Sequence, residues 1–150
     1  MARYHHSRRS AMSREVERIV KAAGRLDEFN AVGDFHLRVE NPGWMALVIE
    51  AHARMENTPG RGERRVSVTH YYEENGDLVP DPDVVIDEFG NPLEMTMATG
   101  QYTPCIWHSP EHDGWLENKR CTASVNELNG MWARNLKEQG YADAAAAICG

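Results

Sequence analysis

The stretch from Arg65 to Ile86, "RVSVTHYYEENGDLVPDPDVVI", carries the pattern that decides the fold. Apolar and polar residues alternate from Val66 to Tyr72, which is typical of a strand with one buried face. The dipeptide Asn75-Gly76 follows, and it is the strongest two-residue hairpin signal because both positions accept positive φ. A short apolar strand is expected over 84–88 after the turn. The stretch therefore predicts two antiparallel strands joined by a tight turn.

Further strands are expected on both sides of this hairpin. "FHLRVE" at 35–40 alternates, whereas "WMALVIEAH" at 44–52 does not, so the second segment indicates a strand covered on both faces. "NPG" between them has turn chemistry, and the two segments are expected to pair. "LEMTMATGQYTPCIWH" at 93–108 has strand character interrupted near Gly100, and a polar loop is expected over 109–120.

An amphipathic helix is predicted near each end of the chain. The first begins at Ser10 or Ser13 and ends before Gly24. The second covers 124–140, where Ser124 and Glu127 form a capping box. The expected fold is therefore α+β, a mostly antiparallel sheet of four to six strands flanked by an N-terminal and a C-terminal helix.

The chain is expected to form one domain. At 150 residues it is long enough to bury a core of its own. We expect a flexible basic arm at 1–10, a single α+β domain at 11–141, and a tail or short helix at 142–150. Trp44 and Trp132 are expected in the core, and the other aromatic residues are scattered along the chain.

Charge and cysteine content exclude several classes of function. The formal net charge is −7, which disfavours a generic nucleic-acid binder, although the first ten residues hold three arginines and no acid. The three cysteines, Cys105, Cys121 and Cys149, include no C-x-x-C pair, and a sparse, odd set suits a reducing compartment. With no signal-like segment and no long apolar run, we expect a cytoplasmic protein without membrane contact.

The acidic residues around the hairpin raise the question of catalysis. An enzyme of this sequence would be a metal-dependent hydrolase that uses His70, Asp77, Asp81 and Asp83. His70, Asp81 and Asp83 are the candidate catalytic residues. The spacing fits no calcium loop, and a histidine on an apolar strand face is more often a core residue bonded to a carbonyl. We therefore expect no metal and no cofactor, and we interpret the acids as turn-shaping residues.

The aromatic and turn residues suggest binding instead. Tyr71 and Trp107 fall on the expected polar sides of their strands, and Asn75 and Asp77 lie at the hairpin turn. Exposed rings can anchor a protein partner or stack on bases. With this acidity a protein partner is favoured over nucleic acid. These four residues are the candidate binding residues.

The central segment resembles a bacterial family of unknown function. The resemblance is carried by "VSVTHYYEENGDLVPDP" at 66–82, "LRVENPGWMALVIE" at 37–50 and "LNGMWARNLKEQGY" at 128–141. Members of that family are small proteins, many of them carried on plasmids and phages. The resemblance implies the order of the elements and a mobile-element context, and it implies no chemistry.

The function expected from the sequence is a non-enzymatic interaction module of a mobile element. It would bind a host protein or itself as a homodimer, through the exposed sheet face or the 71–83 turn. Two alternatives stay open at this point. One is the hydrolase described above, and the other is a nucleic-acid-associated protein, either an acidic DNA mimic or a single-strand binder that uses the basic arm.

Overall fold

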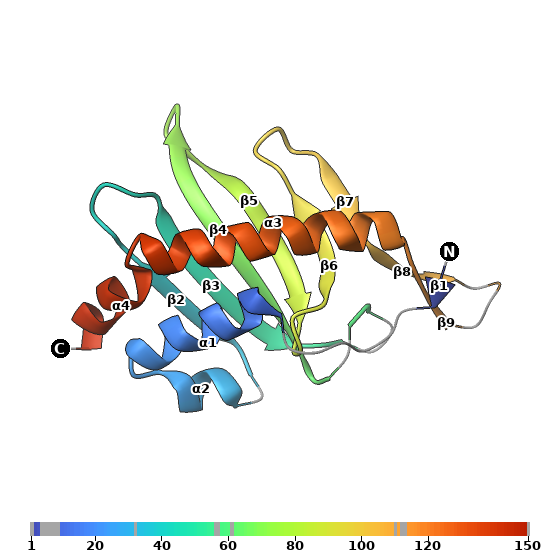
Figure 1. Ribbon diagram of the computed structural model, residues 1–150, viewed down its shortest axis with the longest axis horizontal. Coiled ribbons are helices and arrows are strands. Elements are labelled where there is room, and N and C mark those ends of the chain that lie inside the picture. Colours follow the sequence, from blue (N-terminus) through green and yellow to red (C-terminus); the bar gives the residue numbers. More distant parts are fainter. Residues whose placement is uncertain are drawn as a thin grey trace.

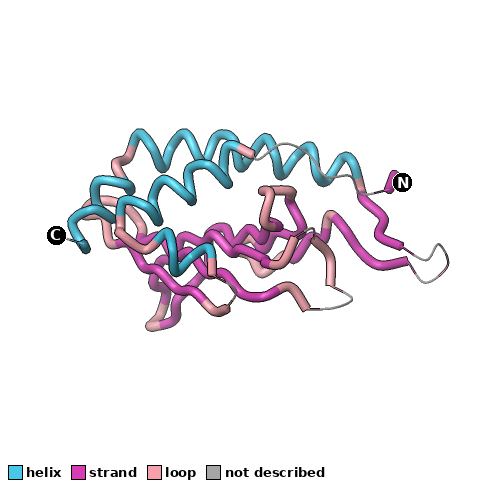
Figure 2. The backbone as a smooth tube through the Cα atoms, turned by 90° about the horizontal axis from the view of Figure 1, so that it is seen from below, coloured by secondary structure: helices cyan, strands magenta, loops and turns pink. Residues whose placement is uncertain are grey.

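The computed structural model describes residues 2–3, 10–31, 33–55, 58–60, 62–109, 111 and 114–149. It has two layers, with the helices on one side of a twisted antiparallel sheet (Figures 1 and 2). The predicted α+β class, with an antiparallel sheet and helices near both ends of the chain, is therefore confirmed. Most of the expected basic arm at 1–10 lies outside the described residues.

Among the residues described above, the main sheet has six strands, which lie in the order of the sequence. Each neighbouring pair is antiparallel, so the sheet is a meander (Figure 1). The strands are β2 (Phe35–Val39), β3 (Ala46–Ala53), β4 (Arg64–Glu74), β5 (Asp77–Asp87), β6 (Pro92–Thr96) and β7 (Tyr102–Pro104).

The register places the apolar residues of neighbouring strands side by side. Leu37 pairs with Ile49, Ile49 with Val68, and Val68 with Val84. These four side chains are at most 3% exposed, and they form one buried row across the sheet. Because side chains alternate between the faces of a strand, this register directs the apolar set toward the helices.

The central hairpin forms as predicted, but its second strand is longer than expected. Asn75 and Gly76 have φ of 53° and 85°, which are the positive values that a tight two-residue turn requires. Strand β5 then runs through Pro80 and Pro82, with a cis Asp81–Pro82 peptide bond. It pairs with β6 only from Asp83 to Ile86. Before Asp83, strand β5 therefore has β4 as its neighbour and is not paired with β6, and prolines are tolerated in such an edge segment.

A second, three-stranded sheet replaces part of the loop expected over 109–120. Strands β8 (Ile106–Ser109) and β9 (Gly114–Glu117) form a hairpin, and β1 (Ala2–Arg3) pairs with β9. The prediction of a loop was wrong for residues 114–117. Turn-forming and charged residues dominate this stretch, so the short apolar segment "WL" gave no strand pattern of its own.

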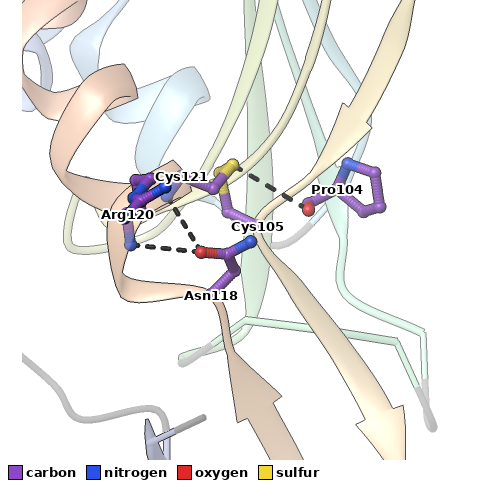
Figure 3. The surroundings of a disulfide bond; sticks show 5 residues. All are labelled: Pro104, Cys105, Asn118, Arg120 and Cys121. Atoms are coloured by element: carbon purple, nitrogen blue, oxygen red, sulfur yellow. Dashed lines mark hydrogen bonds between the residues drawn. A yellow bond between two sulfur atoms is a disulfide. The ribbon is translucent and has the colours of Figure 1, made fainter.

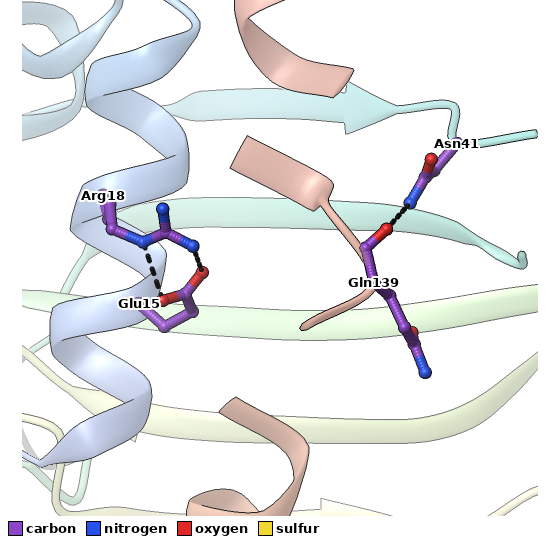
Figure 4. Close-up of polar contacts among 4 residues, drawn as sticks. All are labelled: Glu15, Arg18, Asn41 and Gln139. Atoms are coloured by element: carbon purple, nitrogen blue, oxygen red, sulfur yellow. Dashed lines mark hydrogen bonds and ion pairs between the residues drawn. The ribbon is translucent and has the colours of Figure 1, made fainter. Parts of the chain in front are cut away.

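In the described part of the chain, four helices form the second layer: α1 (Ala11–Ala22), α2 (Leu26–Asn30), α3 (Lys119–Glu138) and α4 (Tyr141–Cys149). Helix α1 begins as predicted, because Ser10 Oγ accepts a hydrogen bond of 3.1 Å from Ser13 N–H. On its side, Glu15 and Arg18 form a two-bond ion pair at 3.0 and 2.8 Å (Figure 4). This bonding raises the pKa of the Arg18 guanidinium above its usual value.

Helix α3 begins earlier than the sequence pattern indicated. Its N-cap is Asn118, whose side-chain oxygen accepts from Arg120 N–H and Cys121 N–H at 3.1 and 3.2 Å (Figure 3). The predicted capping box at Ser124 and Glu127 is therefore wrong, because both residues lie inside the helix. An asparagine serves as an N-cap as well as a serine does, and the helix-forming residues after it carry the helix on from there.

The start of α3 is tied to the sheet by a disulfide bond. Cys105, which is fully buried at the end of β7, bonds to Cys121 in the first turn of α3 (Figure 3). The expectation of reduced, unpaired thiols is therefore wrong for these two cysteines. The cytoplasmic location stays a prediction. None of the described helices is both long and apolar enough to cross a bilayer.

Candidate functional site

The turn between β2 and β3 is fastened to the carboxyl end of α3. Asn41 Nδ2 donates a hydrogen bond of 2.8 Å to the Gln139 carbonyl, which joins two segments far apart in sequence (Figure 4). Trp44 N–H closes the turn on the Asn41 carbonyl at 3.0 Å, with Gly43 at a φ of 89°. Tyr141 at the start of α4 donates its hydroxyl hydrogen to the Met45 carbonyl. The turn is therefore held in one position against the helix layer.

A pocket of about 320 Å³ lies between this turn, strands β4 and β5, and helix α3. We call it the His70 pocket. Apart from His70 its lining holds no carboxylate and no basic side chain, and its volume lies at the lower end of the range for ligand pockets. The residues that line it are Trp44, Met45, His70, Pro82, Leu128, Met131, Trp132, Asn135, Gln139 and Tyr141.

His70 contributes one free ring nitrogen to this pocket. The side chain is 7% exposed and lies between the rings of Trp132 and Tyr141, at centroid distances of 5.3 and 5.5 Å. Its Nδ1 lies 3.2 Å from the Ala46 carbonyl oxygen, which can only accept, so Nδ1 carries the hydrogen. Among the described residues nothing bonds to Nε2. In the neutral ring, Nε2 is then a hydrogen-bond acceptor at the pocket wall.

Burial keeps the His70 ring neutral. Loss of solvation lowers its pKa below the ordinary 6.5, while the Ala46 carbonyl and the charge of Asp81 act in the opposite direction. Burial also raises the pKa of the neighbouring Tyr141 hydroxyl to about 12. At neutral pH both groups are therefore uncharged.

The lowered pKa of His70 predicts that the protein loses stability on mild acidification. Below pH 6.5 the unfolded chain binds a proton at this histidine and the folded chain does not. The free energy of unfolding therefore decreases as the pH is lowered. One proton gives a slope of at most about 1.4 kcal/mol per pH unit. Urea unfolding of the wild type and of His70→Phe between about pH 7.5 and 5 measures this slope. Equal pH dependence in the two proteins would contradict the assignment.

Trp132 lines the same pocket and carries a buried polar atom without a partner. The residue is 6% exposed, and its indole Nε1–H has no hydrogen-bond partner in the described structure. A buried donor without a partner costs stability, so such groups are uncommon and call for an explanation. The pocket lining is therefore mostly apolar, and its polar side chains include His70, Asn135 and Gln139.

Three large apolar side chains stand exposed around the mouth of the pocket. Trp44 is 54% exposed, Met45 38% and Met131 53%, and we call them the apolar rim. The expectation that Trp44 lies in the core was wrong, because it belongs to the turn rather than to β3. Trp44 and Met45 also line a second groove on their other side, together with Tyr71 and Glu73.

The residues expected for a hydrolase do not gather in one place. Asp77 is exposed at the hairpin end, and Asp83 accepts a hydrogen bond of 2.8 Å from the Ser67 hydroxyl. Asp81 acts on His70 through its charge, while the direct partner of His70 is a carbonyl. Within the described part of the chain, no three His, Cys, Asp or Glu side chains form a set that could hold a metal ion.

The four residues expected for binding are spread over the molecule. Tyr71 is half-buried in the groove beside Trp44, where burial and the charges of Asp83 and Glu50 raise the pKa of its hydroxyl. Asn75 and Asp77 lie at the exposed hairpin end, and Trp107 belongs to β8 in the small sheet. Only Tyr71 lies near the His70 pocket, and the binding roles of all four remain predictions.

Sequence reasoning missed the pocket residues that α3 and the turn contribute. Met131 lies within the predicted helix at 124–140, for which no pocket was expected, and Trp44 was expected in the core. The helix carries more large apolar side chains than its core-facing side needs. Met131 is exposed, whereas the neighbouring Trp132 is buried in the core. Such an excess indicates a second apolar contact.

A comparison with protein families gives a match over most of the chain. A family model described as a domain of unknown function (DUF6908) matches residues 14–142, which is most of the chain. This confirms the resemblance to a family of unknown function, while the bacterial and mobile-element context remains a prediction. No curated protein and no solved structure gives a significant match.

Proposed function

Since the chain belongs to the DUF6908 family, whose description assigns no activity, we propose its function from the His70 pocket: it is a non-enzymatic module that binds a protein partner. The observation that supports this is the apolar rim around a pocket with uncharged walls. In protein interfaces, a few aromatic and apolar side chains that enter such pockets contribute most of the binding free energy.

The charge of the chain favours a partner other than a second copy. The net charge is −7, and Glu73 lies in the groove beside Trp44 while Asp81 acts on His70. A partner with an apolar anchor between basic residues would match both the pocket and its surroundings. The resemblance to small plasmid and phage proteins is the reason for placing this partner in a host cell.

Replacing Trp44 with alanine is expected to weaken partner binding at least about tenfold, because exposed anchors of this kind contribute more than about 1.4 kcal/mol. The free energy of unfolding should change by less than about 0.5 kcal/mol, since the side chain is largely exposed. The measurement is quantitative recovery of bound host proteins on the immobilised full chain, followed by affinity measurement for the recovered protein.

Tyr102→Ala is the matched control. Tyr102 is also 54% exposed, but it lies on β7, where its hydroxyl donates to Glu94 at 2.6 Å. The partner should bind this variant as it binds the wild type. The proposal fails if the same proteins bind wild type and Trp44→Ala equally, or if Tyr102→Ala loses them as well.

A further inference from the structure

A groove lies on the side of helix α3 that faces away from the His70 pocket. It has a volume of about 420 Å³ and runs between α1 and α3, which pack against each other in the helix layer (Figure 1). At about 3.6 residues per turn, the α3 residues that line it lie opposite those that line the His70 pocket. We call it the α1–α3 groove. The described residues that line it are Ala11, Arg14, Glu15, Arg18, Gly130, Ala133, Arg134 and Lys137.

The groove concentrates positive charge in a chain whose net charge is −7. Of the described residues that line it, four are basic and one is acidic. The acid, Glu15, is 6% exposed and is already bound by two N–H groups of Arg18 (Figure 4). Asp143 of α4 also acts on Arg18 through its charge. Against these two acids the groove still holds four cations, so an anion from outside would be attracted to it.

Arg18, Arg134 and Lys137 have N–H groups left for a ligand. Arg134 and Lys137 are exposed, and within the described structure their side chains take part in no hydrogen bond and no ion pair. Arg18 binds Glu15 through Nε and Nη2, which leaves its Nη1 group for another acceptor. Because like charges repel, an anion bound among these cations would stabilise the folded chain.

Gly130 keeps the groove open on the α3 side. It lies inside the helix, where glycine is among the least favourable residues. In the described structure a Cβ on Gly130 would meet no atom within 4 Å beyond the neighbouring helix backbone, so no contact inside the protein accounts for the glycine. Glycine is typical of places where a ligand approaches the backbone closely. The groove therefore combines open space with cations around it.

The arrangement of the four cations favours a compact anion. Arg14 and Arg18 lie one turn apart on α1. Arg134 and Lys137 likewise lie one turn apart on α3, so the charges surround one spot and do not form a long row. A phosphate monoester places a charge of about −2 and three acceptor oxygens on one group, whereas a carboxylate carries a single charge. Guanidinium groups also bind phosphate oxygens in pairs.

We propose that the α1–α3 groove binds a terminal phosphate group, with Arg18, Arg134 and Lys137 as its donors and Arg14 adding positive charge. Inorganic phosphate, a phosphorylated side chain and a mononucleotide all present such a group. The inference goes beyond the proposed function, because the groove and the His70 pocket lie on opposite sides of α3. Trp44→Ala should therefore leave phosphate binding unchanged.

Titration of the full chain with three small anions tests the choice of phosphate. The anions are inorganic phosphate, succinate and acetate, added at constant ionic strength and followed by NMR through the backbone amides of Gly130 and Ala133. Phosphate is expected to bind at least about fivefold more tightly than succinate, which carries a similar charge on two separate carboxylates, and acetate more weakly still. Equal binding of phosphate and succinate would overturn the selection of a phosphate group.

A double variant assigns the binding to the groove. Arg134→Ala/Lys137→Ala should weaken phosphate binding at least about tenfold, because it removes two charged donors. Lys119→Ala/Arg120→Ala is the matched control, since it removes the same charge from exposed residues of the same helix that do not line the groove. Its affinity should change less than about twofold. Equal losses in the two double variants would show that phosphate responds to net charge alone, and the site would be wrong.

Gly130→Glu tests the groove without removing a cation. Because a Cβ at this position meets open space, the variant should fold, which circular dichroism checks. The added carboxylate should weaken phosphate binding at least about tenfold, whereas Gly130→Gln, which adds a side chain of the same size without charge, should lose less. Phosphate binding that is unchanged in Gly130→Glu would place the ligand elsewhere and contradict the proposal.

The source of the phosphate is tested with N-acetyl-O-phosphoserinamide and adenosine 5′-monophosphate. Each should bind at least as tightly as inorganic phosphate, and the tighter of the two identifies a phosphorylated protein or a nucleotide as the source. A thymidine tetranucleotide without a terminal phosphate carries only singly charged phosphates and should bind more weakly than either. If it binds more tightly than both and loses that binding in Arg134→Ala/Lys137→Ala, the groove is a nucleic-acid surface and the proposal is wrong.

Discussion

Replacing Asp87 with alanine is expected to lower the free energy of unfolding by about 3 kcal/mol or more, the largest effect of any acid in strand β5. Asp87 is fully buried, and its carboxylate accepts from Phe89 N–H at 2.9 Å, from Asn91 N–H at 3.0 Å and from Asn91 Nδ2 at 2.9 Å. Alanine would remove the acceptor of these three hydrogen bonds, of which the two from Asn91 are buried, and loss of the acceptor of a buried hydrogen bond costs about 1–3 kcal/mol.

The effect should extend to helix α1, because the start of that helix contacts the turn that Asp87 stabilises. Ser10 N–H donates to the Phe89 carbonyl at 3.3 Å, and a Cβ on Gly90 would lie 2.2 Å from Ser10 Oγ. A displaced turn therefore disturbs the helix N-cap as well as the sheet. We expect the loss to appear in urea unfolding followed by circular dichroism.

Asp83→Ala is the matched control for Asp87→Ala. Asp83 is an acid of the same strand, half-buried, with a hydrogen bond from the Ser67 hydroxyl. Its replacement should cost about 1 kcal/mol, the usual contribution of one such bond. A loss for Asp87→Ala no larger than that for Asp83→Ala would contradict the structural role assigned to the buried carboxylate.

These acids show which part of the structure local pattern could predict. Asn75-Gly76 predicted the hairpin correctly, because the turn needs two residues that accept positive φ and the residue types alone show where such a pair lies. Asp87 gave no such signal. Its importance comes from complete burial against the turn, which depends on how α1 packs on the sheet.

The candidate site was less predictable than the fold for the same reason. His70 was expected on a buried strand face with a carbonyl partner, and the structure places it there. The pocket itself needs Met131 from α3 and Trp44 from the β2–β3 turn, which are 87 residues apart in the chain. Alternation and helical spacing describe one element at a time, so neither pattern contains this contact.

The second large effect is expected from the disulfide bond between Cys105 and Cys121. The bond closes a loop with a sequence separation of 16, and a loop of that length stabilises the folded chain by about 3 kcal/mol, chiefly by restricting the unfolded chain. Reductant should therefore lower the free energy of unfolding of the wild type by about that amount. The measurement is urea unfolding with and without dithiothreitol.

The double variant Cys105→Ala/Cys121→Ala should have the lower stability with or without reductant, whereas Cys149→Ala should behave as the wild type does.

Partner binding is expected to change less than about twofold in the double variant. The bond holds the amino end of α3, whereas the pocket lies toward its carboxyl end, where Asn41 binds the Gln139 carbonyl at 2.8 Å. A wild type insensitive to reductant would show that the two thiols are not joined, and loss of binding on reduction would show that the pocket depends on the whole helix.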